Sequence, residues 1–357
     1  MKLLWYIPRL NVGGAESLSI SILNQLSKSN SIILVTDTKN SSLIKYINNS
    51  IKIINLSDRS NFFYIFKLIK LRMIVLKNND YSFVSNLTHA NLNFYISLLF
   101  TRIRFVAIEH NTLSKYLSHK KNIKNIIINT LCKFFYKKIH KIITVSNYVK
   151  KDLINNYGCK NCTTIHNAID IKNIKLKSDL FKFKKTKPYI IFVGRIEKQK
   201  NLIKLLNIYH KLLVNGVCHN LMIVGNGSDF TNLKIKIKKL DLDKKVILLG
   251  EKKNPFPYIK NADLSIMTSK FEGFGIFLIE SLSLGVKIFT YDKKIVPEIT
   301  NNKKFIKIFT ASNIDSANVN KIKFLLNTHI NKKNLKKLVI PYDTKIVSKK
   351  YIKLICS

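Results

Sequence analysis

The chain has 357 residues, 46% of them hydrophobic, which is enough to form two domains with separate cores. Its net charge of +42 is unusually high and points to nucleic acid, a membrane surface or phosphorylated substrates as anionic partners. Because Lys, Asn and Ile are abundant together, as in proteins from AT-rich genomes, we interpret most of the lysine excess as compositional bias, with any functional share gathered in patches.

Targeting segments and cysteines narrow the class of protein. No stretch reaches the roughly 18 uncharged apolar residues of a membrane span, and the closest, residues 62–76, is interrupted by basic side chains. The apolar run at the N-terminus is too short for a signal peptide. The five cysteines fit a reducing cytosol, and the Cys159-x-x-Cys162 pair lacks the second ligand pair of a zinc site. We therefore expect a cytoplasmic protein.

The first half of the chain alternates between strand and helix patterns, which predicts a parallel sheet covered by helices. A buried strand at 2–7 leads into a loop with Gly13 and Gly14, followed by a helix over 15–26. A strand, a glycine loop and a helix N-terminus together make a candidate anion cradle. Further strands are predicted at 31–36, 51–56, 81–86, 105–108, 141–145 and 163–165, and further helices at 61–77 and 147–157.

His110 follows the strand at 105–108, within the sequence Glu109-His110-Asn111. Ligands of open α/β sheets bind outside the carboxyl ends of the strands. A histidine at that edge can act as an acid or base, or hydrogen-bond a substrate hydroxyl. It can equally be a residue that only caps a loop, and its position alone does not decide between the two.

The stretch from His110 to Lys151 inclusive contains ten lysines and no acidic residue. Lysines beside aromatic side chains can lie on an anionic bilayer, and residues 115–151 are where we would place such a contact. The alternative is a helix whose aromatics belong to the core and whose lysines form a solvated face.

The α/β pattern restarts at a strand over 189–193, after a lysine-rich segment at 171–187 that is interpreted as a linker. Arg195 and Lys200 flank the following strand-to-helix turn, where two cations could clamp a diphosphate. Arg is much rarer than Lys in this chain, so Arg195 is the more informative of the two.

Two further motifs bear on whether the chain has a dinucleotide site or a metal site. A strand at 221–224 ends in Gly225-Asn-Gly227, but position 230, where a dinucleotide fingerprint has its third glycine, holds Phe230. A nicotinamide or flavin site is therefore disfavoured. Asp241 and Asp243 have the D-x-D spacing of metal-dependent sugar transferases, yet they precede the strand at 246–249, the wrong end for a ligand, and are interpreted as a surface loop.

A strand at 262–268 is followed by a glycine turn and a helix, and this stretch, 269–285, organises the second half. Glu272 lies in the turn and Glu280 eight residues later in the helix. Gly273 and Gly275 allow close approach of a ligand to the backbone, and the helix directs N–H groups into the same space. The pattern suits a sugar diphosphate; the alternative is an ordinary turn with surface glutamates. A strand at 287–290 and a terminal helix over 342–355 complete the predicted elements.

In this order the motifs resemble those of family 4 glycosyltransferases. The matching residues are Gly13-Gly14-Ala15-Glu16, Glu109-His110-Asn111, Val145-Ser146 with Asn167–Asp170, Val193–Arg195 with Lys200, Val224–Gly227, and Glu272 with Glu280. The resemblance implies the α/β GT-B fold, with two Rossmann-like domains that have parallel sheets and face each other across a cleft. The domains would be 1–170 and 188–341, joined by the linker 171–187, with the helix at 342–357 crossing back to the first domain.

The resemblance also implies roles for individual residues. Arg195 and Lys200 would neutralise the diphosphate leaving group, and Glu280 would hold the ribose hydroxyls. Glu272 would hold the sugar and distal phosphate together with the backbone of Gly273, Phe274 and Gly275.

In the first domain, Gly13 and Gly14 would let the backbone approach the phosphates, and His110 would contact the donor sugar or the reacting centre. Transfer would retain the anomeric configuration and need neither a metal nor a cofactor, with a UDP- or GDP-linked sugar as co-substrate.

This sequence departs from the family pattern at Ala168, which replaces a glycine, at Lys287, which replaces a frequent proline, and at Gln199-Lys200, where many relatives have Lys-Gly. The motifs most resemble bacterial enzymes that build surface glycans (O-antigen, capsule or lipooligosaccharide) on lipid carriers, with a glycan or lipid-linked acceptor. The alternatives are a nucleotide-sugar epimerase of the same fold and a basic nucleic-acid-binding protein. The sequence shows no binding module that would favour the latter.

Overall fold

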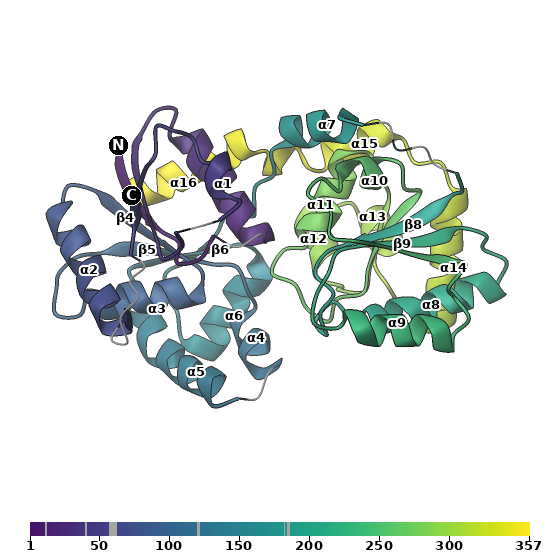
Figure 1. Cartoon of the computed structure of the whole chain (residues 1–357), viewed down its shortest axis with the longest axis horizontal. Coiled ribbons are helices and arrows are strands. Elements are labelled where there is room, and N and C mark those ends of the chain that lie inside the picture. Colours follow the sequence, from purple (N-terminus) through teal and green to yellow (C-terminus); the bar gives the residue numbers. More distant parts are fainter. Residues whose placement is uncertain (11–12, 40, 57–62, 120–121, 182, 184–185) are drawn as a thin grey trace. The chain divides into compact units, whose positions relative to one another are not determined.

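The chain divides into two compact units (Figure 1). The computed structural model describes residues 1–357 except 11–12, 40, 57–62, 120–121, 182 and 184–185. The N-terminal unit comprises Met1–Ala168 and Tyr342–Ser357, and the C-terminal unit comprises Ile169–Pro341. The division at 168 lies two residues from the boundary at 170 expected from the sequence.

The N-terminal unit is built on a seven-stranded parallel sheet with the order β3-β2-β1-β4-β5-β6-β7. Chain order reverses between β1 and β4, so the loops after these two strands diverge at that point. The strands are β1 (Lys2–Tyr6), β2 (Ser31–Thr36), β3 (Lys52–Asn55), β4 (Ser82–Asn86), β5 (Phe105–Glu109), β6 (Lys141–Thr144) and β7 (Cys162–Thr164).

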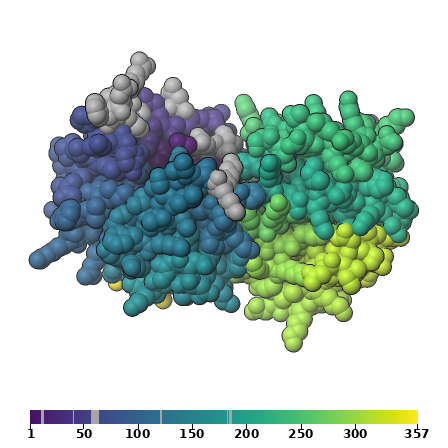
Figure 2. Space-filling model, turned by 90° about the horizontal axis from the view of Figure 1, so that it is seen from below, coloured from purple at the N-terminus to yellow at the C-terminus, as the bar shows by residue number. Residues whose placement is uncertain are grey.

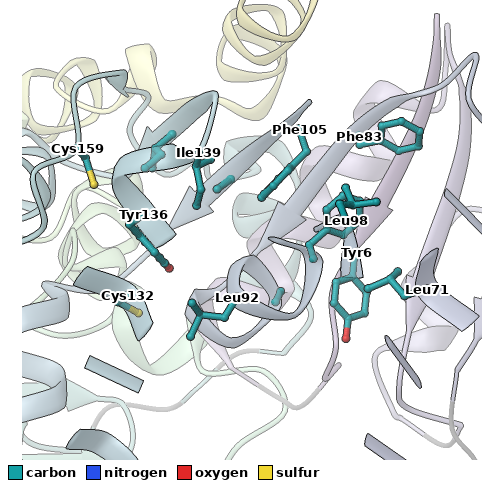
Figure 3. Close-up of a cluster of buried hydrophobic side chains, with 14 of the residues drawn as sticks. Tyr6, Leu71, Phe83, Leu92, Leu98, Phe105, Cys132, Tyr136, Ile139 and Cys159 are labelled. Carbon is teal, nitrogen blue, oxygen red and sulfur yellow. The ribbon is translucent and has the colours of Figure 1, made fainter. Parts of the chain in front are cut away.

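Helices cover both faces of this sheet, because successive side chains of a strand point to opposite sides. Leu4 and Tyr6 of β1 join the core beneath α2, α3 and α5, which Figure 3 shows. Leu3 and Trp5 join the core beneath α1 and α16. The helices are α1 (Gly14–Leu26), α2 (Phe63–Lys77), α3 (Thr88–Ser97), α4 (Leu113–His119), α5 (Ile123–Phe135), α6 (Asn147–Tyr157) and α16 (Thr344–Cys356).

The C-terminal helix α16 belongs to the N-terminal unit. Tyr351 is buried against Trp5, with ring centroids 6.0 Å apart, and the Thr344 hydroxyl lies 3.2 Å from that of Ser21 on α1. The aromatic contact places α16 on the same face of the sheet as α1.

The C-terminal unit has a five-stranded parallel sheet with the order β10-β9-β8-β11-β12, and its chain order reverses between β8 and β11. The strands are β8 (Tyr189–Val193), β9 (Asn220–Val224), β10 (Val246–Gly250), β11 (Leu264–Met267) and β12 (Ile288–Thr290). The helices are α7 (Ile171–Asp179), α8 (Leu202–Val214), α9 (Phe230–Lys239), α10 (Phe256–Lys260), α11 (Ile276–Ser283), α12 (Ile295–Ile299), α13 (Lys303–Phe309), α14 (Asp315–Asn327) and α15 (Lys332–Lys337).

The prediction of a linker at 171–187 is wrong for its first half, which forms α7 and belongs to the C-terminal unit. The Asp170 side chain caps this helix by accepting a hydrogen bond from the Asn173 N–H at 2.9 Å. Ile174 and Ser178 are buried while the lysines lie on the other side. One buried apolar residue in a lysine-rich segment gives too weak a periodicity to reveal a helix from the sequence.

The lysine-rich segment 115–151, where the sequence analysis places a membrane contact, does not form a single surface. It contributes to α4, α5, α6 and the largely buried strand β6. Lys141 on β6 donates to the backbone carbonyl of Leu354 at 3.3 Å and is not available as part of a common basic face.

Two glycines allow the loops after β8 and β9 to pack together. A Cβ placed on Gly225 would lie 1.9 Å from the carbonyl oxygen of Gly194, and one on Gly227 would lie 2.3 Å from that of Ile196. The Ile196 N–H donates to the Asn226 carbonyl at 2.9 Å across the same contact. The Gly-Asn-Gly motif therefore serves loop packing that fixes the backbone on either side of Arg195.

We expect Gly225→Ala to lower the free energy of unfolding by about 3 kcal/mol or more, because the methyl group would overlap a backbone carbonyl that cannot rotate away. Gly216→Ala is the matched control: Gly216 also has a positive φ, of 82°, but nothing within 4 Å of an added Cβ. This control should lose only about 1 kcal/mol. Urea unfolding followed by far-ultraviolet circular dichroism measures both, and equal losses would contradict the packing role.

Candidate functional site

The charged residues singled out in the C-terminal unit lie at the carboxyl edge of its sheet, where chain order reverses. Arg195 and Lys200 follow β8, and Glu272 follows β11, which pairs directly with β8. Loops that diverge at such a point leave a crevice in open α/β sheets, and ligands bind there.

Hydrogen bonds hold the two loops together. The Thr268 hydroxyl contacts the carbonyls of both Lys200 and Asn201 at 3.1 Å. The Lys270 N–H donates to the Gln199 carbonyl at 2.9 Å, and the Gln199 side chain donates to the Phe271 carbonyl at 3.0 Å. The position of the Lys200 ammonium relative to Glu272 is therefore set by the backbones of both loops.

Lys200 and Glu272 form a partly buried salt bridge, with Nζ and Oε1 2.6 Å apart and side chains 19% and 10% exposed. The Glu272 N–H in turn donates to Asp292 Oδ2 at 3.2 Å. Asp292 also accepts from the Lys294 N–H at 3.1 Å, and burial raises the pKa of this carboxyl. Asp292, after β12, thus supports the turn that carries Glu272.

Arg195 differs from Lys200 because it is largely in solvent. Its guanidinium contacts Glu197 at 3.0 Å, and its side chain is 66% exposed. Exposed ion pairs contribute at most about 1 kcal/mol, so little is lost when the guanidinium turns toward another anion.

Glu280, on α11, is a half-buried carboxylate to which no donor within the described residues gives a hydrogen bond. Burial raises its pKa to about 7, and the charge of Lys177 offsets this only in part. A desolvated carboxylate without donors is unfavourable unless a ligand completes it, so Glu280 is suited to accept hydrogen bonds from hydroxyl groups.

The turn between the two glutamates depends on Gly275, whose φ of 72° begins α11. An added Cβ there would also lie 2.9 Å from the Ile295 side chain. Phe274 is buried, whereas Gly273 is partly exposed. The backbone at 273–275 is therefore held in one conformation ahead of the N–H groups of the helix.

In the N-terminal unit, Glu109 is fully buried and accepts hydrogen bonds on both oxygens. Oε2 accepts from Thr88 at 2.9 Å and Tyr136 at 2.8 Å, while Oε1 accepts from the backbone N–H groups of His110 and Asn111, both at 3.0 Å. Burial raises the pKa of this carboxyl, and the four donors oppose the rise. Glu109 therefore fixes the backbone that carries His110.

His110 contacts Asn86, at the end of β4, with Nε2 and Oδ1 2.7 Å apart. The Asn86 amide donates to the Ser19 hydroxyl, which donates to the Ala15 carbonyl at 2.7 Å on α1. This chain of donors assigns the proton of neutral His110 to Nε2. Nδ1 is then a buried acceptor with no partner among the described residues.

Burial lowers the pKa of His110 to about 4, so the imidazole is neutral near pH 7. A neutral ring suits hydrogen bonding to a hydroxyl better than general acid catalysis.

Gly13 and Gly14 lie at the N-terminus of α1, Gly13 as its N-cap, next to the Glu16 carboxylate. Residues 11–12 of the proposed anion cradle lie outside the described residues.

The other motifs considered in the sequence are the D-x-D pair and the two neighbouring cysteines. Asp241 and Asp243 lie in the connection from α9 to β10, away from the carboxyl edge. Cys159 and Cys162 are free and buried. Across the residues whose placement is described, no group of three His, Cys, Asp or Glu side chains could hold a metal ion.

Sequence reasoning missed Asn86, Asp292 and Asn201. Asn86 and Asp292 lie at or just after strand ends, so the carboxyl-edge rule could have found them. Asn201 has a left-handed φ of 54°. The position whose backbone conformation favours glycine is therefore 201, one residue after the Gln199-Lys200 pair that the sequence analysis compares with Lys-Gly. Asn is among the few residues that tolerate this conformation.

Two family models match the chain. The model described as Glycosyltransferase Family 4 matches residues 12–173, and the model described as Glycosyl transferases group 1 matches residues 173–339. The chain belongs to the family 4 glycosyltransferases.

A relative of this family 4 glycosyltransferase is an N-acetylgalactosamine-N,N'-diacetylbacillosaminyl-diphospho-undecaprenol 4-alpha-N-acetylgalactosaminyltransferase from Campylobacter jejuni. The two are 30% identical over 240 residues, and the match spans 64% of each chain, just under two thirds. The amylovoran biosynthesis glycosyltransferase AmsD from Erwinia amylovora is 22% identical over 320 residues, 87% of each chain.

Solved structures show the same GT-B fold. Anabaena HepE in complex with UDP-glucose has a TM-score of 0.78 at 17% identity, covering 100% of this chain and 99% of that one. TarM has a TM-score of 0.78 at 14% identity, covering 100% and 99%. The expected fold class is therefore confirmed.

We expect Glu280→Gln to stabilise this glycosyltransferase at alkaline pH. Burial raises the carboxyl's pKa from 4.5 to about 7 in the folded state, so stability is lost as pH rises through that window. The amide cannot ionise, and the variant should therefore exceed the parent by on the order of 1 kcal/mol near pH 8.

Near pH 4 the variant and the parent should be equal in stability. Asp243→Asn, which removes the same charge from an exposed residue of this unit, should show no such pH dependence. Urea unfolding at both pH values tests this, and a Glu280→Gln variant less stable than the parent near pH 8 would show that the carboxylate has a structural partner.

Proposed function

We propose that this chain transfers a sugar, with retention of anomeric configuration, from a nucleoside diphosphate sugar to a glycan or lipid-linked acceptor in bacterial surface polysaccharide synthesis. The observation that carries the proposal is Glu280, a half-buried carboxylate with a pKa raised to about 7 and no donor among the described residues. In the C-terminal unit it belongs to the same strand–turn–helix as Glu272, which is paired with Lys200.

Each group has a chemical task in this proposal. The ribose hydroxyls donate to Glu280, which relieves its desolvation. Arg195 and Lys200 bind the diphosphate and stabilise the charge that develops as it leaves. Glu272, released in part from Lys200 when a diphosphate competes for the ammonium, accepts from the sugar hydroxyls, and the backbone at 273–275 donates to it or to the distal phosphate.

His110 has a different task, which follows from its tautomer. Its Nδ1 accepts a hydrogen bond from a sugar hydroxyl, because Nε2 already donates to Asn86. The ring stays neutral and moves no proton.

In the transfer step, the acceptor oxygen forms a bond to the anomeric carbon on the face that the diphosphate leaves. The bond from that carbon to the diphosphate oxygen breaks, and the acceptor's proton passes to the departing phosphate oxygen. The cations and helix N–H groups perform the charge stabilisation that a metal ion performs in other transferases.

Two relatives support the choice of substrates. Anabaena HepE has been solved with UDP-glucose, which favours a UDP-linked sugar as the first donor to test. The Campylobacter jejuni relative is named for an acceptor on diphospho-undecaprenol, which favours a lipid-linked acceptor. An epimerase of the same fold would instead consume the donor without an acceptor, so a donor-only turnover assay separates these two activities.

Donor affinity should decrease as the pH is lowered, because Glu280 becomes protonated. With a pKa of about 7, only the ionised fraction binds tightly, so the Kd for a UDP-sugar should be about tenfold higher near pH 6 than near pH 8. Glu280→Gln should bind at least tenfold more weakly near pH 8 and lose this pH dependence. Titration calorimetry measures the Kd, with Asp243→Asn as the charge-matched control, and unchanged affinity in Glu280→Gln would refute the role.

Arg195→Ala should lower kcat by about a hundredfold or more while KM for the donor changes less than tenfold, because the exposed guanidinium acts mainly on charge that develops in the transition state. Arg104→Ala, an exposed arginine of the N-terminal unit that no proposed role involves, is the control. Steady-state rates with donor and acceptor decide the case. An effect confined to KM would assign Arg195 to binding alone, and an equal loss in both variants would show that the effect is not specific to Arg195.

A further inference from the structure

Three helices of the N-terminal unit border a hollow that has no part in the proposed transfer. Its volume is about 400 Å³, and side chains of α4, α5 and the last turn of α6 line it. These helices lie together on the lower side of the unit in Figure 1, and Figure 2 views the molecule from that side, with α4 and α5 in its blue-teal part. Cavities of this size hold small molecules or parts of larger ones.

Much of the hollow lies away from the edge of the sheet that carries His110. Helix α6 begins beside that edge, directly after β6, and Asn156 and Tyr157 are in its last turn. With 11 residues, this helix extends roughly 16 Å from the edge. The part of the hollow next to Asn156 is therefore separate from the candidate site at the carboxyl ends of the strands.

A buried carboxylate fixes one wall of the hollow. Asp152 on α6 accepts hydrogen bonds from the Ser114 N–H at 3.0 Å and from the Ser114 hydroxyl, and it accepts from the Asn156 side-chain amide at 2.9 Å. A carboxylate can only accept, so Asn156 directs its N–H₂ group to Asp152 and its carbonyl oxygen elsewhere. No donor among the described residues reaches that oxygen, which leaves an acceptor for a ligand.

The wall formed by α5 offers the complementary group. The Tyr157 hydroxyl donates to Asn129 Oδ1 at 2.8 Å, and burial raises the pKa of this phenol, so it keeps its proton. The Asn129 oxygen is thereby occupied, and the two N–H bonds of its amide have no acceptor within the described part of the chain. Asn129 thus presents donors to the hollow that Asn156 provides with an acceptor.

A sugar ring matches this combination of groups. Each hydroxyl both donates and accepts, so neighbouring hydroxyls of one ring can accept from the Asn129 amide and donate to the Asn156 carbonyl. The C–H face of the ring needs an apolar contact. Leu117, which is buried, and Ile126, which is 62% exposed, supply apolar side chains in the same lining.

The same lining is poorly suited to charged or fully apolar ligands. Lys133 is the only cation among the described residues that line the hollow, whereas a phosphate is held best by bidentate donors such as arginine. An acyl chain would cover Asn129 and Asn156 without giving them hydrogen bonds, which is unfavourable. None of the helices in the described residues has the length and apolarity that crossing a bilayer requires.

We propose that the hollow between α4, α5 and α6 is a second carbohydrate-binding site, which takes one or two residues of a neutral oligosaccharide. Asn129 donates to one sugar hydroxyl, Asn156 accepts from a neighbouring one, and the apolar side chains of α4 and α5 contact the ring. The proposal does not rest on the proposed transfer reaction, because binding is measured without a donor substrate.

The test is a saturation-transfer-difference NMR titration of the full chain with two neutral trisaccharides, maltotriose and chitotriose. At least one of them should bind with a Kd of about 1 mM or tighter. Pyrophosphate at the same concentration should not displace it, since the lining holds a single ammonium.

Two variants remove the open groups one at a time. Asn129→Asp keeps an acceptor for the Tyr157 hydroxyl and removes the amide N–H groups, and Asn156→Ala removes the carbonyl acceptor. Each should raise the Kd at least about fivefold. Asn155, an exposed neighbour on α6 outside the lining, provides both matched controls, Asn155→Asp and Asn155→Ala, which should change the Kd less than about twofold. Circular dichroism checks that all four variants keep the parent's fold.

Three results would overturn the proposal. The first is no saturation transfer to either trisaccharide up to about 10 mM, tenfold above the expected Kd. The second is binding by Asn129→Asp and Asn156→Ala that equals the parent's, which would place the sugar elsewhere, the transfer site included. The third is displacement of the sugar by pyrophosphate, which would make the hollow an anion site around Lys133. Failure of the proposed transfer activity would change none of these readouts.

Discussion

The salt bridge between Lys200 and Glu272 joins two loops that follow the neighbouring strands β8 and β11, and it sets the balance of charge in the C-terminal site. The bridge is possible because Thr268 and Gln199 tie the two backbones together over the preceding residues. A partly buried ion pair has to recover the cost of desolvating both groups. The hydrogen bonds between the two loops help to offset that cost, because they hold Lys200 and Glu272 close together independently of the ion pair.

Three glutamates show how the surroundings of a carboxylate separate structural from ligand-binding roles. Glu109 is fully buried and has four donors, so its hydrogen bonds are complete and it can only position other groups. Glu272 is only 10% exposed and is paired with the Lys200 ammonium, a partner for which the diphosphate of a ligand can compete. Glu280 accepts from none of the described donors, and burial raises its pKa to about 7, a perturbation that is common at ligand-binding sites.

In the N-terminal unit, a buried carboxylate and a chain of hydrogen bonds act on the same histidine. Glu109 holds the backbone of His110, while Asn86 and Ser19 fix the tautomer of its ring through a chain of donors that reaches α1. On the outer side of the same unit, α2 and α5 carry apolar side chains that the fold does not bury. The hydrogen-bond network of His110 thus lies at the carboxyl edge of the sheet, and the exposed apolar side chains lie on helices that cover one face of the sheet.

The sequence by itself determined the α/β class, most strands and the motif residues at their carboxyl ends, because strand periodicity and glycine turns are local properties. Val193–Arg195 and the turn at 272–275 could be placed in this way. Helix α7 could not, because its single buried isoleucine has meaning only against α10 and α11. Only the tertiary structure decided that Lys200 meets Glu272, that Glu280 has no donor among the described residues, and that α2 is apolar toward solvent. Each of these is a relation between segments distant in the chain, and burial and pairing are set by packing that no local pattern records.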